Sequence, residues 1–233
     1  MKAFRSLGIV FLVLCGLSSS GFSRERFSAG INFTLGIPQN EFNENINTTG
    51  LGGSGYFSFR LPKSPLSIGT SFSVLVYGSE TREEFLNAAI PEVIVDVKTH
   101  NYILLCNLFL RVQPHQGQFR PYAEGLIGFN YLWTETGIYD QSGPSFDEIA
   151  SSVNLDDFSL NYGLGGGLMM QVYQRQNSAF AVFIDLGVRY LKGGKAEYLR
   201  EGDIVQLNGE VIYNVSYSNT DLITAHIGVA FTF

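Results

Sequence analysis

Six ionisable residues alternate with apolar residues along extended segments of the chain: Arg60, Arg111, Glu124, Asp185, Arg189 and His226. In an extended segment, alternation places these side chains on one face and the apolar side chains on the other. Charged groups that are enclosed by protein need partners of opposite charge. We therefore expect a network of salt bridges and hydrogen bonds that fills the interior. The alternative is a gated polar path, in which the same residues would line a narrow channel for small solutes.

Other residue types that support catalysis or ligand binding lack the characteristic spacings. The histidines His100, His115 and His226 form no H-x-x-x-H pair and no Ser-His-Asp arrangement. Residues 50–55 match G-x-G-x-x-G, but that motif binds a dinucleotide only between a strand and a helix, and here an alternating segment follows. The acidic segments lack the spacing of a calcium-binding loop. We expect no cofactor, no metal site and no catalytic residue.

The first 23 residues predict a secretory signal peptide. Lys2 and Arg5 precede a short apolar run, and small residues follow it. A lipoprotein leader is the alternative at Cys15, but the residue before it, Leu14, is too large for that motif. Removing the leader leaves 13 basic against 21 acidic residues, a net charge of −8 that argues against nucleic acid as a partner. Cys106 is then the only cysteine, so no disulfide can form within one chain.

Residues 24–233 predict one all-β domain of eight antiparallel strands. Apolar and small or polar residues alternate with a period of two, most clearly in the last twelve residues. The expected strands are residues 27–37, 53–61, 66–76, 101–112, 122–134, 158–172, 179–190 and 222–233. Long polar connections follow the first, third, fifth and seventh strands, and short ones follow the others. A transmembrane β-barrel has this in-phase asymmetry, with an apolar face toward lipid and a polar face toward the interior. Trp133, Tyr131, Tyr162 and Tyr190 near the strand ends would form its outer aromatic girdle.

The strand count, the alternating loops and the terminal aromatic resemble the small outer-membrane barrels that include the OmpA transmembrane domain and OmpX. The resemblance covers residues 27–233 and implies an up-and-down barrel in the bacterial outer membrane, with outer-membrane lipid and the barrel assembly machinery as partners. It also implies that Ile227, Val229, Phe231 and Phe233 form the assembly signal. Nothing follows Phe233, so the peptidoglycan-binding domain of longer OmpA relatives is not expected. Some such barrels modify lipids, which leaves a hydrolase using His100 as a further alternative.

The segment before the last strand predicts a surface hairpin. Asn208-Gly209 is the dipeptide that a type I′ turn prefers, because both positions need a positive φ. From Val211 to the C-terminus the apolar residues keep one odd-numbered register, so we expect the last two strands to continue out of the membrane as one hairpin. Such an edge can pair with an extended segment of another protein. The expected function is therefore structural or adhesion-like, with extracellular proteins or a host surface as partners.

Overall fold

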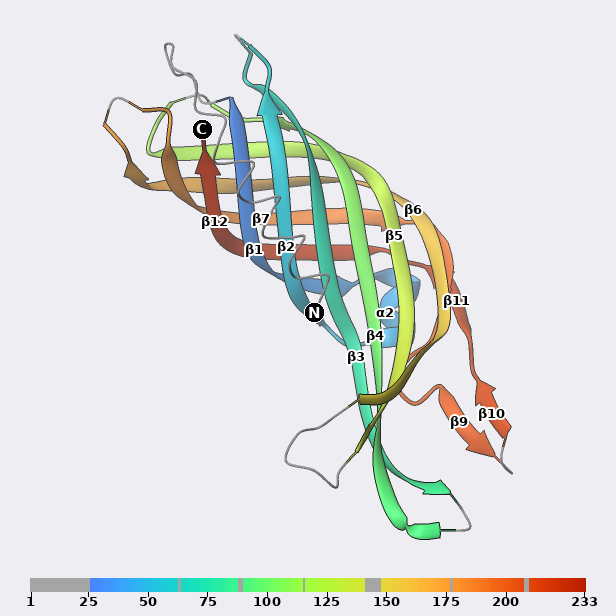
Figure 1. Ribbon diagram of the computed structural model, residues 1–233. Coiled ribbons are helices and arrows are strands. Elements are labelled where there is room, and N and C mark those ends of the chain that lie inside the picture. Colours follow the sequence, from blue (N-terminus) through green and yellow to red (C-terminus); the bar gives the residue numbers. More distant parts are fainter. Residues whose placement is uncertain are drawn as a thin grey trace.

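A computed structural model describes residues 26–233 except Lys63, residues 88–89, His115, residues 141–147, Asn177 and residues 208–209. The predicted leader and the Asn208-Gly209 dipeptide therefore lie outside the described residues. Eight antiparallel strands close into a ring in the order β1-β12-β7-β6-β5-β4-β3-β2, as Figure 1 shows. They are β1 (Phe27–Pro38), β2 (Gly50–Arg60), β3 (Leu66–Asn87), β4 (Ile90–Val112), β5 (Phe119–Asp140), β6 (Glu148–Gln174), β7 (Ala181–Gly193) and β12 (Leu222–Thr232). The expected eight-stranded barrel is confirmed.

The first and last strands pair directly, so the barrel has no open edge along its wall. Thr232 lies opposite Ser28, and Leu222 lies opposite Pro38. The strands are tilted relative to the barrel axis. Following paired residues once around the ring from Ile37 leads back to a different residue of β1. The path runs Ile37, Ile223, Tyr190, Leu164, Gly125, Leu110, Ile68, Phe59 and back to β1 at Phe27. Such a stagger is the geometric condition for closing a small barrel.

The two faces of each strand separate as the alternation predicts. On β1, Ile31 is 64% exposed and Phe33 is 53% exposed, whereas Asn32 and Thr34, which alternate with them, are buried. The exposed apolar side chains form a band around the outside of the barrel, and the buried polar ones fill its interior. Among the described residues, no helix is long and apolar enough to cross a membrane.

Two of the connections expected to be polar loops are strands, which corrects the sequence interpretation. β3 and β4 stay paired as far as Asn87 and Ile90, and β5 and β6 stay paired as far as Tyr139 and Glu148. Figure 1 shows these four strands extending well beyond the rest of the barrel, at the end away from the C-terminus. Both faces of this extension lie outside the lipid-facing band, so neither face needs an apolar alternation. We call the part of β3–β6 beyond the barrel the extracellular sheet.

The last hairpin is also interrupted, although one continuous strand was expected from Val211 to the C-terminus. It is divided into β8 (Lys195–Tyr198), β9 (Ile204–Leu207), β10 (Glu210–Tyr213) and β11 (Ser216–Asn219), and it forms two small sheets, β8–β11 and β9–β10. The break before β12 has a clear cause at Asp221. Its carboxylate accepts hydrogen bonds from the Gly193 backbone N–H at 3.0 Å and from Asn40 Nδ2 at 2.7 Å, which hold this residue against the end of β7 and the start of α2.

The first connection contains an unexpected short helix, α2 (Asn40–Ile46). It is bounded by two residues in the left-handed region, Asn40 (φ 51°) and Asn47 (φ 46°). Asparagine tolerates that region better than most residues, because its short polar side chain bonds locally. The helix has one buried side chain, Phe42, which points into the mouth of the barrel.

Candidate functional site

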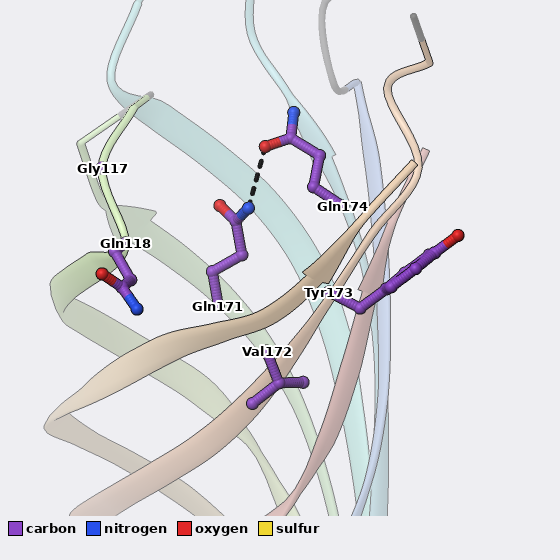
Figure 2. A pocket seen from close by; sticks show the side chains of 6 residues that line it. All are labelled: Gly117, Gln118, Gln171, Val172, Tyr173 and Gln174. Carbon is purple, nitrogen blue, oxygen red and sulfur yellow. Dashed lines mark hydrogen bonds between the residues drawn. The ribbon is translucent and has the colours of Figure 1, made fainter. Parts of the chain in front are cut away.

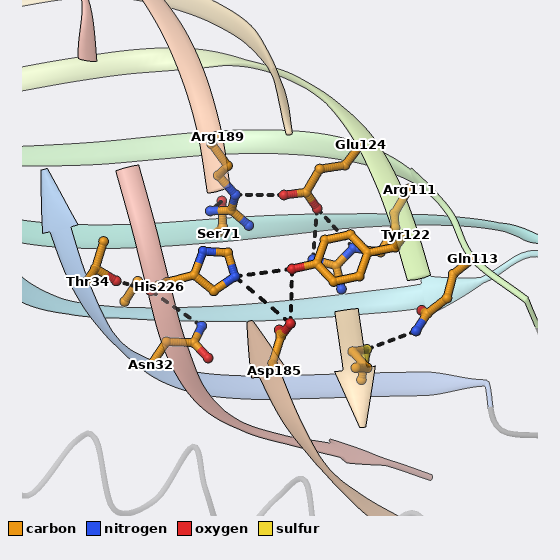
Figure 3. Close-up of polar contacts among 12 residues, drawn as sticks. Asn32, Thr34, Ser71, Arg111, Gln113, Tyr122, Glu124, Asp185, Arg189 and His226 are labelled. Carbon is orange, nitrogen blue, oxygen red and sulfur yellow. Dashed lines mark hydrogen bonds and ion pairs between the residues drawn. The ribbon is translucent and has the colours of Figure 1, made fainter. Parts of the chain in front are cut away.

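The centre of the barrel interior holds one carboxylate between two guanidinium groups. Arg111 Nε lies 2.9 Å and its Nη2 lies 2.8 Å from Glu124 Oε2, and Arg189 Nε lies 2.6 Å from Glu124 Oε1 (Figure 3). Glu124 is fully enclosed, and both arginines are buried. Arg111 and Glu124 face each other directly across β4 and β5. Arg189 also donates a hydrogen bond to Ser71 Oγ at 3.4 Å.

Glycines in β6 and β7 make the arrangement possible. Gly165 lies between Glu124 and Arg189 in the register, so the two side chains meet across a strand that contributes no side chain there. A Cβ atom at Gly165 would lie 2.8 Å from Arg189 Cγ. At Gly187, a Cβ atom would lie 2.4 Å from the Tyr122 hydroxyl. The inward glycines therefore act as space for the charged and aromatic side chains of neighbouring strands.

A second polar group lies beside the first. The Tyr122 hydroxyl donates to Asp185 Oδ1 at 2.9 Å and lies 3.2 Å from His226 Nε2, which is 4.0 Å from the same carboxylate oxygen (Figure 3). The Tyr122 ring also connects the two groups, because the Arg111 guanidinium lies 4.0 Å from its centroid. We call Arg111, Tyr122, Glu124, Asp185, Arg189 and His226 the lumen network.

The lumen network differs in one partner from the sequence expectation. Asp185 was expected to share its network with an arginine, but the hydrogen bond and the ion pair of its Oδ1 atom are with Tyr122 and His226. Tyr122 itself was not singled out, although its position two residues before Glu124 places it on the inward face. Arg60, the remaining predicted member, is buried on β2 opposite Ser67 of β3.

The outer mouth is closed by an apolar cluster that we call the extracellular cap, made of Phe42, Tyr77, Tyr198 and Leu199. The Phe42 ring lies 5.1 Å from the Tyr198 ring, edge to face, and 6.2 Å from the Tyr77 ring. Hydrogen bonds satisfy the buried hydroxyls: Tyr77 donates to the Leu199 carbonyl at 3.3 Å, and Tyr198 bonds Ser218 Oγ at 2.7 Å. The cap thus joins the first connection to the last one over the barrel.

Beyond the cap, the last connection is fastened to β3. A compact turn forms where Arg200 Nε and Nη2 bond both oxygens of Asp203, at 2.9 and 3.1 Å, and this hydrogen bonding raises the pKa of Arg200. From this turn the Gly202 N–H donates to Glu80 Oε2 at 3.0 Å, and Arg82 Nη1 donates to the Ile204 carbonyl at 2.9 Å. The edge of the extracellular sheet on the β3 side is therefore partly covered.

The remaining predicted chemical groups do not converge on a site. His100 lies on β4 opposite Glu135 of β5, and its ring lies 5.9 Å from that of Tyr102. His115 lies outside the described residues. Within the described part of the chain, no group of three His, Cys, Asp or Glu side chains is placed to hold a metal ion. The glycines of residues 50–55 belong to β2, where Gly52 packs so closely on the Val74 carbonyl that a side chain would collide.

One shallow pocket of about 510 Å³ lies at the short-turn end, lined by Gly117, Gln118, Gln171, Val172, Tyr173 and Gln174. Figure 2 shows the Gln171 amide donating to Gln174 Oε1, at 2.8 Å, so part of its polar lining is already satisfied internally. The pocket is open and contains no charged side chain.

Two aromatic belts border the exposed apolar band. At the short-turn end Phe27 packs against Phe57, and Phe180 packs against Phe231 and Phe233, with ring centroids 5.8 to 6.4 Å apart. At the other end Trp133 stacks with Tyr102 at 4.8 Å and with Tyr131 at 5.5 Å. Aromatic girdles at both interfaces are typical of barrels that span a membrane.

No protein-family model and no curated protein sequence matches the chain. Among solved structures, it is similar to a major outer membrane protein of Thermus thermophilus, with 11% identity, 89% of this chain and 99% of that chain covered, and a TM-score of 0.45. It is also similar to OprG of Pseudomonas aeruginosa, with 13% identity, 91% and 98% covered, and a TM-score of 0.42. Ail of Yersinia pestis shows 14% identity, 91% and 100% coverage, and a TM-score of 0.41.

The closed ring, the exposed apolar band and the two aromatic belts lead to one conclusion about the architecture. Short turns join the strands at the end that contains the C-terminus, and the long connections all lie at the other end, as in barrels whose loops face outward from the cell. The chain is an eight-stranded antiparallel β-barrel of the bacterial outer membrane, similar to the OmpA and OmpX type.

Proposed function

We propose that this barrel is a non-catalytic surface protein that binds extended segments of extracellular partner proteins. The observation that carries the proposal is the extracellular sheet. Four strands continue past the membrane while β2 and β7, their neighbours in the ring, end near its border at Gly50 and Gly193. A sheet that extends in this way presents strand edges to the outside, and an edge can accept a further strand.

The β6 edge of this sheet is the better candidate for binding. β7 pairs with β6 only as far as Asn161, and beyond it the Gly194 N–H donates to the Leu160 carbonyl at 2.7 Å. In the described residues 149–156, no strand pairs with the side of β6 away from β5. This stretch begins with the uncharged run Ile149-Ala150-Ser151-Ser152-Val153, whose two large apolar side chains are exposed. The run from Ile149 to Val153 lacks the charges and prolines that commonly protect a free edge.

The β9–β10 hairpin supports the same function as a second contact element. Leu207 pairs with Glu210, and the turn predicted at Asn208-Gly209 lies outside the described residues. Val205, Val211 and Tyr213 are exposed on this hairpin. This hairpin forms a small sheet separate from the barrel strands and would contact a partner through these exposed side chains.

The contents of the interior support a plugged lumen in preference to a channel. The lumen network and the extracellular cap lie one above the other, and the side chains of both are largely buried. An eight-stranded barrel is only just wide enough for its own side chains. Planar-bilayer recordings test this directly: we expect no stepwise conductance from the purified protein, and regular single-channel steps would support the narrow channel instead.

Strand-edge variants test the binding proposal. Ile149→Lys together with Val153→Lys places two charges on the β6 edge, and we expect bacteria that display this variant to lose adherence to a cultured epithelial monolayer. Asn43→Lys together with Thr48→Lys adds the same charge at exposed positions away from any strand edge, and should keep adherence. A third variant removes most of the β9–β10 hairpin. In it, a two-residue turn connects Ile204 directly to Tyr213, the residue with which it pairs.

A different electrophoretic mobility of boiled and unboiled samples should show that each variant is folded. Equal adherence of the edge variant and the unaltered protein would contradict the role of β6. Adherence no greater than that of cells without the protein would contradict the surface function as a whole.

A further inference from the structure

The outward face of β7 changes character where the strand leaves the lipid-facing band. Val188 and Tyr190 are exposed at successive outward positions, and Lys192 occupies the next one. After Gly193 and Gly194 the outward face continues with Lys195, the first residue of β8. Both lysines are exposed. Two ammonium groups therefore lie directly beyond the apolar surface, at the level where lipid headgroups begin.

Tyrosine side chains flank these lysines on three strands. Lys195 Nζ lies 5.5 Å from the ring centroid of Tyr217 on β11. Tyr162 of β6 is the residue paired with Lys192, and Tyr190 precedes Lys192 on the same face of β7. All three rings are exposed on the outside of the barrel. An exposed tyrosine at a membrane border packs its ring on acyl chains and presents its hydroxyl to headgroups.

The acidic groups nearby leave the lysines available. Asp221 is turned inward, where it accepts the hydrogen bonds from Gly193 and Asn40. Asp157 accepts a hydrogen bond from the Glu197 N–H at 2.8 Å. Glu197 is an exposed carboxylate at the next outward position beyond Lys195. In the described part of the chain, neither lysine forms an ion pair with any of these groups.

The scarcity of lysine makes this pair conspicuous. Beyond the predicted leader, lysine occurs only at positions 63, 98, 192 and 195 of an acidic chain. Lys63 lies outside the described residues. Lys98 lies on the extracellular sheet, where its Nζ is 4.8 Å from the ring centroid of Tyr139. Lys192 and Lys195 are therefore a local concentration of positive charge at the outer border of the band.

We propose that Lys192 and Lys195, with Tyr162, Tyr190 and Tyr217, form a binding site for the phosphate group of a phosphorylated glycolipid in the outer leaflet. The ammonium groups would bind the phosphate, and the tyrosine rings would pack on the sugar and the first acyl carbons. This site is independent of the proposed binding of partner proteins, because it faces the surrounding lipid and not the strand edges. It assigns the barrel a specific lipid neighbour at one sector of its circumference.

The expected effect follows from the binding free energy that one lysine contributes near anionic lipid. Each lysine contributes roughly a fivefold change in affinity at the membrane surface, so removing both should weaken binding by about 25-fold. The interaction should also weaken as salt is added, since exposed charges are screened over about 10 Å at 0.1 M ionic strength.

Lipid retention tests the proposal with purified protein in phosphatidylcholine nanodiscs. The discs contain either diphosphorylated lipid A or the same lipid after removal of its phosphates, and native mass spectrometry of the released protein measures the lipid that stays bound. We expect the unaltered protein to retain the phosphorylated form and to lose it in the Lys192→Gln, Lys195→Gln double variant. Arginine at both positions should preserve retention, and Lys98→Gln, which removes a lysine charge from the extracellular sheet, should leave it unchanged.

Three results would overturn the proposal. They are equal retention by the glutamine double variant, an equal loss caused by Lys98→Gln, and equal retention of the dephosphorylated lipid. Displacement of the lipid by millimolar inorganic phosphate would assign the site to free phosphate and would also contradict it. The lysines are exposed, so altered electrophoretic mobility on boiling should remain in every variant.

Discussion

Replacing Glu124 with glutamine should destabilise the barrel more than any other single change in its interior. The substitution preserves the shape of the side chain but removes the negative charge that two buried arginines share. Arg111 and Arg189 would then face each other across the lumen without a counterion. Removing one partner of a buried ion pair typically costs about 3–5 kcal/mol. Since Glu124 serves two guanidinium groups at 2.6 to 2.9 Å, we expect a cost near the upper limit of that range.

Two controls separate the charge effect from packing. Asp185→Asn should cost only about 1–3 kcal/mol, because Asp185 accepts a hydrogen bond from Tyr122 and is not the counterion of an arginine. A triple variant with Arg111→Met, Glu124→Leu and Arg189→Met removes all three charges together. It should lose much less stability than Glu124→Gln, because a buried ion pair can often be exchanged for apolar side chains of similar size at little cost.

Urea titration of the protein folded in lipid vesicles measures these free energies of unfolding. Trp133 is the only tryptophan of the chain, and it lies at the outer border of the band, so its fluorescence should report transfer from lipid to water. A change below about 1 kcal/mol in Glu124→Gln would refute the reasoning, because it would mean that water reaches the arginines and replaces the carboxylate.

Three further changes test other contacts. Gly187→Ala should lower the free energy of unfolding by about 1–3 kcal/mol in the same titration, because the added methyl would lie 2.4 Å from the Tyr122 hydroxyl. Gly125→Ala is the control and should be close to neutral, since the nearest neighbour of its methyl would be 3.9 Å away. Phe42→Ala should cost about 3–5 kcal/mol locally and speed proteolysis of the first connection, while conductance stays absent because the lumen network is intact. Deleting Phe233 should reduce the heat-modifiable protein in the outer membrane, since this residue exchanges backbone hydrogen bonds with Phe27 and closes the ring; normal levels would contradict an assembly role for the last strand.

The barrel wall could be predicted from the sequence because its two environments alternate with every residue. Lipid outside the barrel and packed polar side chains inside it impose a period of two on the sequence. All eight transmembrane strands show this alternation clearly enough to be located. Even β4, whose inward face carries Ile103, Leu105 and Phe109, follows the rule, since these three are buried and their neighbours are not. The pairing of β1 with β12 follows from closure alone, because an open edge cannot remain in lipid.

The extracellular structure was harder to predict, since outside the membrane no such alternation is required. Residues 78–98 carry many charges and were interpreted as a loop, yet residues 78–87 and 90–98 form the outer parts of β3 and β4. Helix α2 has only seven residues and no side-chain hydrogen bond at its N-cap, so the sequence contains no clear start signal for it. The inward charges were identified, but their partners depend on the stagger between strands, which an alternation pattern does not contain.

The stagger also explains why the interior is organised around glycine. Tilted strands bring Glu124 level with Gly165 and Arg189, and bring Gly167 beside Gly187 and His226. A large side chain on one strand is thus accommodated by a missing one on the next, so Arg111, Tyr122 and Arg189 can extend into the centre of a narrow barrel. The same complementarity that stabilises the network leaves little room for solute. The surfaces available for function are then the outer ones, where we propose that the extracellular sheet binds other proteins and the two lysines bind lipid.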